Sequence, residues 1–146
     1  MYKEVYRAEE SIPGSALPER FGSSRCYSTS IYYLLEYPEF SAFHRLEQDE
    51  IWHFYDGSNL VVHIIDRNGD YSCRRVGRDI DKDETLQLVI NTGCLFAAEV
   101  EDAGSFALIG CTVAPGFEFE DFDAPDRKTL LERYPKHADL IEKFTR

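Results

Sequence analysis

The stretch from residue 40 to residue 57, FSAFHRLEQDEIWHFYDG, holds the side chains of this chain that are best suited to chemistry. It combines two imidazoles, His44 and His53, with the carboxylate of Glu50 and the indole of Trp52. An imidazole titrates near neutral pH and can ligate a metal, and a neighbouring carboxylate can orient it. Such a set can bind a metal, move a proton or hold a small polar ligand, so the segment predicts a pocket.

The elements that would position these residues are mainly β-strands. Runs of β-branched and aromatic residues alternate with turn residues through position 114, as is typical of strands and hairpins. We expect strands at 2–8, 28–35, 40–46, 50–55, 60–66, 71–76, 85–90, 95–100 and 105–114, a loop at 9–26, and turns at 56–57, 67–70, 91–93 and 102–104.

The C-terminal residues follow a different pattern. Pro125 can open a helix through residues 126–134, and Pro135 ends it and can start another, in which Ala138, Ile141 and Phe144 share one face. Nine short strands followed by two short helices predict a mainly β sandwich or barrel, formed by a single domain over residues 1–146.

Charge and composition exclude several classes of partner. The 146-residue chain carries a formal net charge of −11, which repels phosphate backbones and anionic membrane surfaces. We therefore expect no nucleic-acid partner and no membrane association. No stretch approaches the roughly 18 apolar residues of a spanning helix, and the first residues lack a signal-peptide pattern. With four scattered cysteines, expected as buried thiols, this predicts a cytoplasmic protein.

Strand alternation predicts which side chains face the interior. If Glu50 points inward, Trp52 and Phe54 do too, and His53 points outward. The same parity, carried across the next turn, points His63 inward.

Three uses of these residues remain open. His44 and Glu50 could begin a metal site with His63 as third ligand, or could form a hydrogen-bonded pair that fixes the pocket's shape. Either His44 or His63 could act as a general base. Its acid partner would come from Tyr32, Tyr33 or Tyr55, which could equally be core residues.

Two further groups could take part in binding. Trp52, Phe54 and Phe96 could form a stacking wall, or only pack in the core. Arg7, Arg25 and Arg45 could bind an anionic ligand, or pair with the abundant carboxylates of the chain itself.

Several motifs resemble those of a known family. The pattern His44-x-Leu46-x(3)-Glu50-x(6)-Gly57 resembles the first signature of the cupin superfamily, and residues 91–96 (NTGCLF) resemble the second. The segments TSIYYLL, DEIWH, CTVAPGF and LERYPKHA are similar to one small cupin family long described as a domain of unknown function. The resemblance covers nearly the whole chain. It implies a double-stranded β-helix, or jelly-roll barrel, that forms homodimers.

The sequence departs from the general cupin signature at two ligand positions. Leu46 and Phe96 stand where histidines are usual, so that only His44 and Glu50 remain of the usual metal-binding set. This argues against a standard cupin metal site and leaves no cofactor expected, with a divalent metal as the alternative.

Three functions are compatible with the resemblance. The first is a small-molecule-binding protein with a metal-free pocket lined by His44, Glu50, Trp52, His63 and Phe96. The second is an isomerase or epimerase acting on a sugar-like carbonyl substrate, and the third is a metal-dependent, dioxygenase-like enzyme. We expect the first, within a homodimer that could exchange the strand at residues 2–7.

Overall fold

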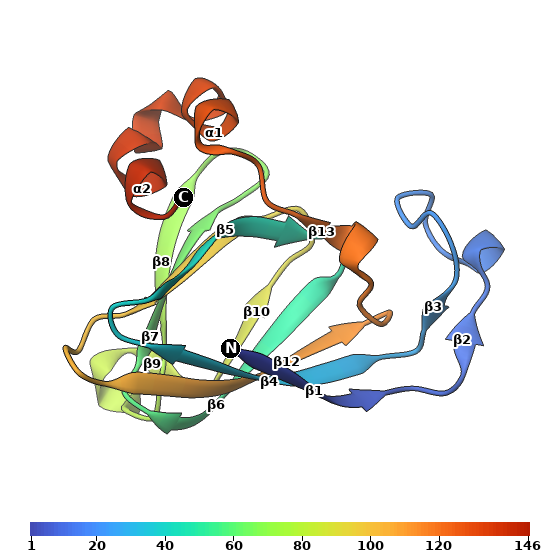
Figure 1. Ribbon diagram of the computed structural model, residues 1–146, viewed down its shortest axis with the longest axis horizontal. Helices are drawn as coiled ribbons and strands as arrows, with labels where there is room; N and C mark the ends of the chain where they lie inside the picture. The colour runs from blue at the N-terminus through green and yellow to red at the C-terminus, as the bar shows by residue number, and fades with distance from the viewer.

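Two β-sheets face each other across a barrel interior in the computed structural model, which describes residues 1–146 (Figure 1). The five-stranded sheet has the order β1 (Tyr2–Arg7), β4 (Thr29–Glu36), β12 (Phe106–Ala114), β6 (Asp49–Gly57) and β10 (Gln87–Ile90). The six-stranded sheet has the order β13 (Phe122–Asp123), β5 (Phe40–Leu46), β11 (Leu95–Val100), β7 (Leu60–Ile65), β8 (Tyr71–Val76) and β9 (Glu84–Thr85). The jelly-roll barrel predicted from the sequence is confirmed.

Alternating side chains of both sheets fill the interior at one end of the barrel. Every second residue of β10 is buried, as a half-buried strand requires. The main core includes Leu60, Val62, Leu88, Phe96, Ala98 and Ile109. The other end of the barrel is left open for a cavity.

The C-terminal helices cover the outer face of the six-stranded sheet. They are α1 (Arg127–Arg133), the 3-10 turn η4 (Pro135–His137) and α2 (Ala138–Lys143), and they lie together beside the barrel in Figure 1. The Asp126 side chain caps α1 by accepting a hydrogen bond from the Thr129 amide at 2.8 Å. Ile141 and Phe144 are fully buried in a second core against Phe43 and Leu95.

Three local features differ from the sequence-based prediction. The strand expected at 85–90 is divided between β9 and β10, which belong to different sheets. The turn expected at Asp56 and Gly57 is instead the end of β6, where Gly57 adopts a φ of +93°. The loop at 9–26 contains β2 (Ser11–Ile12), the 3-10 turn η1 (Gly14–Ala16) and β3 (Arg25–Cys26).

The first strand is an edge strand. β1 pairs antiparallel with β4 of the same chain, and its other edge has no partner strand.

The remaining elements are two 3-10 turns, η2 (Ile80–Lys82) and η3 (Phe119–Asp121). No helix has the length and apolar character needed to cross a membrane.

Candidate functional site

A cavity of about 710 Å³ opens between the two sheets. Its walls come from β4, β5, β6 and β12, and its rim comes from β1 and from residues 116–124, which we call the cap segment. Phe117, Phe119 and Phe122 of the cap segment turn onto the cavity. The size lies within the range of small-molecule sites.

The inward face of β6 supplies the centre of the site, as strand alternation predicts. Glu50 and Trp52 line the cavity and are buried, whereas His53 lies on the outer face, 3.3 Å from the Thr112 hydroxyl. Cys111 of β12 is in register with Trp52 and also lines the cavity.

Glu50 is a buried carboxyl without adequate hydrogen bonding. It is 8% exposed, and its Oε2 atom has no hydrogen-bond partner. The indole Nε1 of Trp52 is likewise buried without a partner. Burial raises the pKa of Glu50 to about 7, although the neighbouring Trp52 indole and Cys111 thiol act in the opposite direction.

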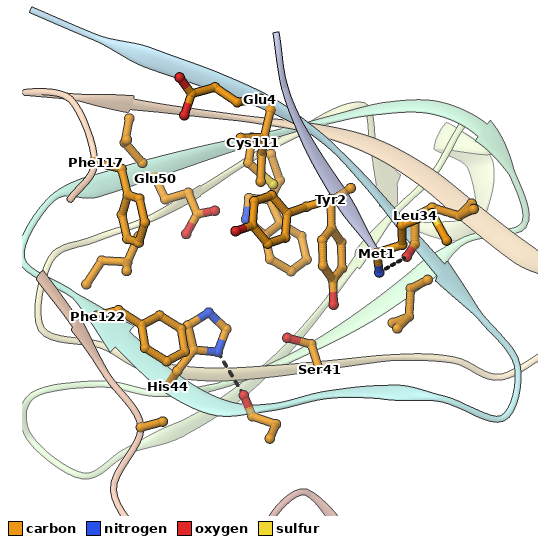
Figure 2. Close-up of a pocket in the computed structure, with 18 of the residues that line it drawn as sticks. Met1, Tyr2, Glu4, Leu34, Ser41, His44, Glu50, Cys111, Phe117 and Phe122 are labelled. Atoms are coloured by element: carbon orange, nitrogen blue, oxygen red, sulfur yellow. Dashed lines mark hydrogen bonds between the residues drawn. The ribbon is translucent and has the colours of Figure 1, made fainter. Parts of the chain in front are cut away.

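His44 faces Glu50 from the opposite sheet (Figure 2). Its Nδ1 atom lies 2.8 Å from the Ala42 carbonyl oxygen, which can only accept, so Nδ1 carries the hydrogen. Figure 2 shows the other ring nitrogen, Nε2, turned toward the cavity. Desolvation lowers the pKa of His44, which makes the neutral ring with a free Nε2 lone pair the main form at pH 7.

Aromatic rings fix the orientation of His44. Phe122 stacks on the imidazole with ring centroids 5.0 Å apart, and Phe96 lies at 4.1 Å on another side. Phe96 contacts Trp52 edge-on at 5.8 Å. It is nevertheless buried behind these side chains and is not part of the cavity lining, contrary to the sequence-based expectation.

His63 does not belong to the cavity, and its predicted inward orientation is wrong. Leu60 and Val62 of β7 fill the interior, so His63 faces the C-terminal helices on the other side of the sheet. Its Nδ1 accepts from the Tyr71 hydroxyl at 2.8 Å, and its Nε2 is 3.1 Å from the Glu99 carboxylate. The Phe144 ring lies 4.7 Å away. This arrangement joins the helices to the sheet.

The sequence-based prediction missed several lining residues. Ser41 of β5 and the rim residues Tyr2 and Glu4 of β1 contribute to the cavity. The pairing of Tyr2 with Tyr33 and of Glu4 with Ile31 puts these β1 side chains on the inner face. Only the register of β1 on β4 reveals this, and no local sequence signal does.

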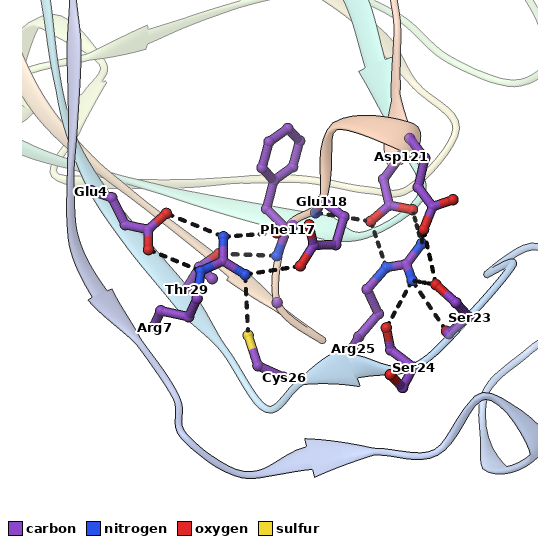
Figure 3. Close-up of polar contacts among 12 residues, drawn as sticks. Glu4, Arg7, Ser23, Ser24, Arg25, Cys26, Thr29, Phe117, Glu118 and Asp121 are labelled. Carbon is purple, nitrogen blue, oxygen red and sulfur yellow. Dashed lines mark hydrogen bonds and ion pairs between the residues drawn. The ribbon is translucent and has the colours of Figure 1, made fainter.

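Polar contacts hold the cap segment over the cavity (Figure 3). Arg25, 1% exposed, donates to Asp121 through Nε at 2.9 Å and through Nη2 at 2.6 Å. Arg7 donates to Glu4 at 2.9 Å, to Glu118 at 3.0 Å and to the Phe117 carbonyl.

The three arginines considered as anion ligands therefore bind carboxylates of their own chain. Arg45 follows the same pattern, with Asp123 at 2.7 Å.

The side chains present do not fit a resident divalent metal. A metal site of this kind needs about three protein donors. Leu46 and Phe96 provide none, and no group of three or more His, Cys, Asp or Glu side chains is placed to hold an ion. His44 and Glu50 are the remaining pair, one donor short of such a site.

Comparison with known proteins agrees with the fold. The family described as Cupin superfamily (DUF985) matches residues 1–124. Protein SO0799 from Shewanella oneidensis is 34% identical, with a TM-score of 0.88 over 99% of this chain and 85% of that one. A hypothetical protein from Leishmania major is 29% identical, with a TM-score of 0.89 over 99% of this chain and 88% of that one.

More distant similarity concerns the fold alone. Oxalate decarboxylase from Bacillus subtilis is 13% identical, with a TM-score of 0.58 over 92% of this chain and 34% of that chain. No curated protein matches the sequence. The family match, the jelly-roll sheets and the interior cavity agree with one another, and the chain belongs to the cupin superfamily, in the family DUF985.

Proposed function

We propose that the chain is a small-molecule-binding protein whose ligand occupies the barrel cavity. The observation that carries this proposal is the buried carboxyl of Glu50 in the cavity wall, whose Oε2 atom has no hydrogen-bond partner. Each unsatisfied buried group costs about 1–3 kcal/mol. A ligand whose polar group donates a hydrogen bond to Glu50 Oε2 and whose apolar body contacts the surrounding rings recovers that cost.

Filling the cavity tests the proposal. Ser41 lines the cavity, whereas Ser15 is exposed in the loop at 9–26, so Ser41→Phe and Ser15→Phe form a matched pair. Native mass spectrometry of the purified wild-type protein should show a retained small molecule, or the protein should bind the neutral dye Nile red. Ser41→Phe should lose that binding and Ser15→Phe should keep it. Equal binding by both variants would contradict the proposal.

A second candidate is acid–base chemistry on the bound molecule, of the isomerase or epimerase type. The observation in its favour is that His44 Nε2, an acceptor, faces a Glu50 carboxyl whose pKa of about 7 suits proton transfer at neutral pH. A carbonyl ligand with an adjacent C–H would then exchange that proton with solvent. In D₂O the wild type should incorporate deuterium into such a ligand, while His44→Gln should bind it without exchange.

We also propose that the protein works in the cytoplasm. All four cysteines, Cys26, Cys73, Cys94 and Cys111, are free thiols, as a reducing compartment favours. Fractionation of cells that express the chain tests this proposal.

A further inference from the structure

We propose that the cavity binds an organic cation, a protonated primary amine on an apolar body, with the ammonium group between Glu50 and His44. This inference rests on the binding function proposed above and adds the chemical class of the ligand.

The charges around the cavity favour a cation. Two arginine side chains line it against five glutamates, which are Glu4, Glu36, Glu39, Glu50 and Glu118. The protein as a whole carries −11. A positively charged ligand is therefore attracted to the opening, whereas a phosphate or carboxylate is repelled.

Both arginines at the rim already contact groups of their own chain. Arg7 is bonded to Glu4 and Glu118, as described above. Arg146 donates to the Phe40 carbonyl at 3.1 Å, lies 3.8 Å from Glu39 and stacks over the Phe40 ring. The amino group of Met1, also at the rim, donates to the Leu34 carbonyl. Binding an anion at Arg7 would require breaking one of its contacts with Glu4, Glu118 or the Phe117 carbonyl.

Two acceptors face each other at the centre of the cavity, and the one donor beside them, the Trp52 indole N–H, acts on Glu50 and favours its ionised form. Glu50 is more than nine-tenths buried and presents an unpartnered Oε2, and His44 presents the Nε2 lone pair from the opposite wall. An ammonium group carries several N–H donors and can bond to both acceptors at once. The nearby cation also favours the ionised form of the buried Glu50 carboxyl.

Aromatic rings complete the environment. The faces of aromatic rings attract cations, most strongly when water is excluded. The rings that line the cavity include those of Tyr2, Tyr33, Phe40, Trp52, Phe117 and Phe122. The same rings supply apolar contacts for the body of the ligand.

Three probes of equal size and different charge test the inference: phenethylamine, 2-phenylethanol and phenylacetate, each titrated calorimetrically at pH 7. The amine should bind at least about tenfold more tightly than the alcohol, and the acid most weakly. Glu50→Gln should weaken binding of the amine much more than binding of the alcohol, so that the preference for the amine disappears. Glu9→Gln, an exposed position outside the cavity, should behave like the wild type.

Two results would overturn the cation inference: tighter binding of phenylacetate than of phenethylamine, or an unchanged preference in Glu50→Gln. If Glu50→Gln does not fold, His44→Ala serves instead and should weaken binding of the amine about tenfold. Binding of Nile red distinguishes a failure of the cation inference from a failure of the binding function. If the wild type binds the dye, Ser41→Phe does not, and the amine binds no more tightly than the alcohol, only the cation inference fails. If neither the dye nor any probe binds, the binding function fails as well.

Discussion

Glu50 couples the stability of the protein to pH, because its carboxyl is buried in the cavity wall. Its pKa rises from the usual 4.5 to about 7 on folding. A raised pKa in a carboxyl means that the folded state holds the proton more tightly than the unfolded state. As pH rises from about 4.5 to 7, the unfolded chain ionises first, so the free energy of unfolding should fall by about 3 kcal/mol.

Comparison with a variant that cannot ionise isolates this contribution. Urea unfolding of the wild type and of Glu50→Gln should be followed at pH 4 and at pH 8. The wild type should lose about 3 kcal/mol relative to the variant between these two conditions. Parallel changes in both proteins would show that Glu50 titrates normally.

His44 and His63, both predicted from the sequence to line the pocket, should differ in what their replacement by alanine changes. His63→Ala removes contacts with Tyr71, Glu99 and Phe144, and we expect a loss of about 2 kcal/mol in stability without a change in ligand binding. His44→Ala should reduce ligand affinity instead. Thermal unfolding and Nile red titration of both variants would measure the two effects. A loss of binding in His63→Ala at temperatures where it is folded would contradict this assignment.

Strand alternation was reliable where one face of a strand is buried more than the other. It placed Glu50 and Trp52 inward and His53 outward because β6 has the cavity on one side only. β7 gives no such signal, since the run LVVHII is buried on one face in the barrel interior and on the other under the helices. Alternation counted from Glu50 also does not carry over to His63, because β6 has a register shift between Phe54 and Asp56 against β12.

At the scale of elements, the cap segment depends on one buried ion pair with two further contacts. Besides Arg25, the Asp121 carboxylate accepts from Gln48 at 2.7 Å and from the Glu118 amide at 3.2 Å. Asp121→Ala leaves a buried guanidinium without its main partner, which should cost about 3–5 kcal/mol. Hydrogen exchange should increase in the cap segment and around residues 23–26 before it increases in the sheets.

An exposed ion pair provides the control for this variant. Arg75 and Glu101 form a contact of 3.1 Å in which both side chains are at least 40% exposed. Glu101→Ala should therefore change stability by less than about 1 kcal/mol. If the two variants lost similar stability, the buried pair would not be the anchor of the cap segment.

The elements themselves could be predicted well because local sequence determines most of them. The strands at 40–46, 71–76 and 95–100 have the bounds expected, and Gly93 and Gly104 end up with positive φ in the expected turns. The break at Leu86 between β9 and β10 could not be predicted, because it reflects a crossing between sheets rather than a turn residue. The position of the cap segment could not be predicted either, because it depends on contacts with Arg25, which is distant in the sequence.

At the scale of the whole molecule, the outer face of the five-stranded sheet is uncharged over much of its area. One row across the sheet, set by strand pairing, consists of Val89, Ile51, Thr112, Ser30 and Tyr6. Val89 and Tyr6 are more than half exposed. In a chain of charge −11, this row without carboxylates is where a second copy can approach with the least repulsion.

We therefore predict a homodimer in which two such faces pack together about a two-fold axis. Light scattering after size exclusion should give a mass of about twice the 16.9 kDa of one chain. Thr112→Glu introduces a carboxylate into each of the facing surfaces and should yield monomers, whereas Ser15→Glu should not. A monomeric wild type, or a dimer unaffected by Thr112→Glu, would contradict this arrangement.

Exchange of β1 between the two copies is a separate prediction, made from the sequence and open to a direct test. Tyr2 and Tyr33 are paired on the inner face of the sheet, away from the proposed interface. In a background in which the free thiols Cys73 and Cys111 are replaced by serine, cysteines at both positions join β1 to the β4 with which it pairs. If β1 is exchanged, oxidation of Tyr2→Cys/Tyr33→Cys should produce a covalent dimer on a non-reducing gel. A cross-linked monomer would show that each β1 stays with its own β4, as the strands pair in this structure. The dimer would then rest on the outer sheet face alone, and Thr112→Glu should separate its subunits completely.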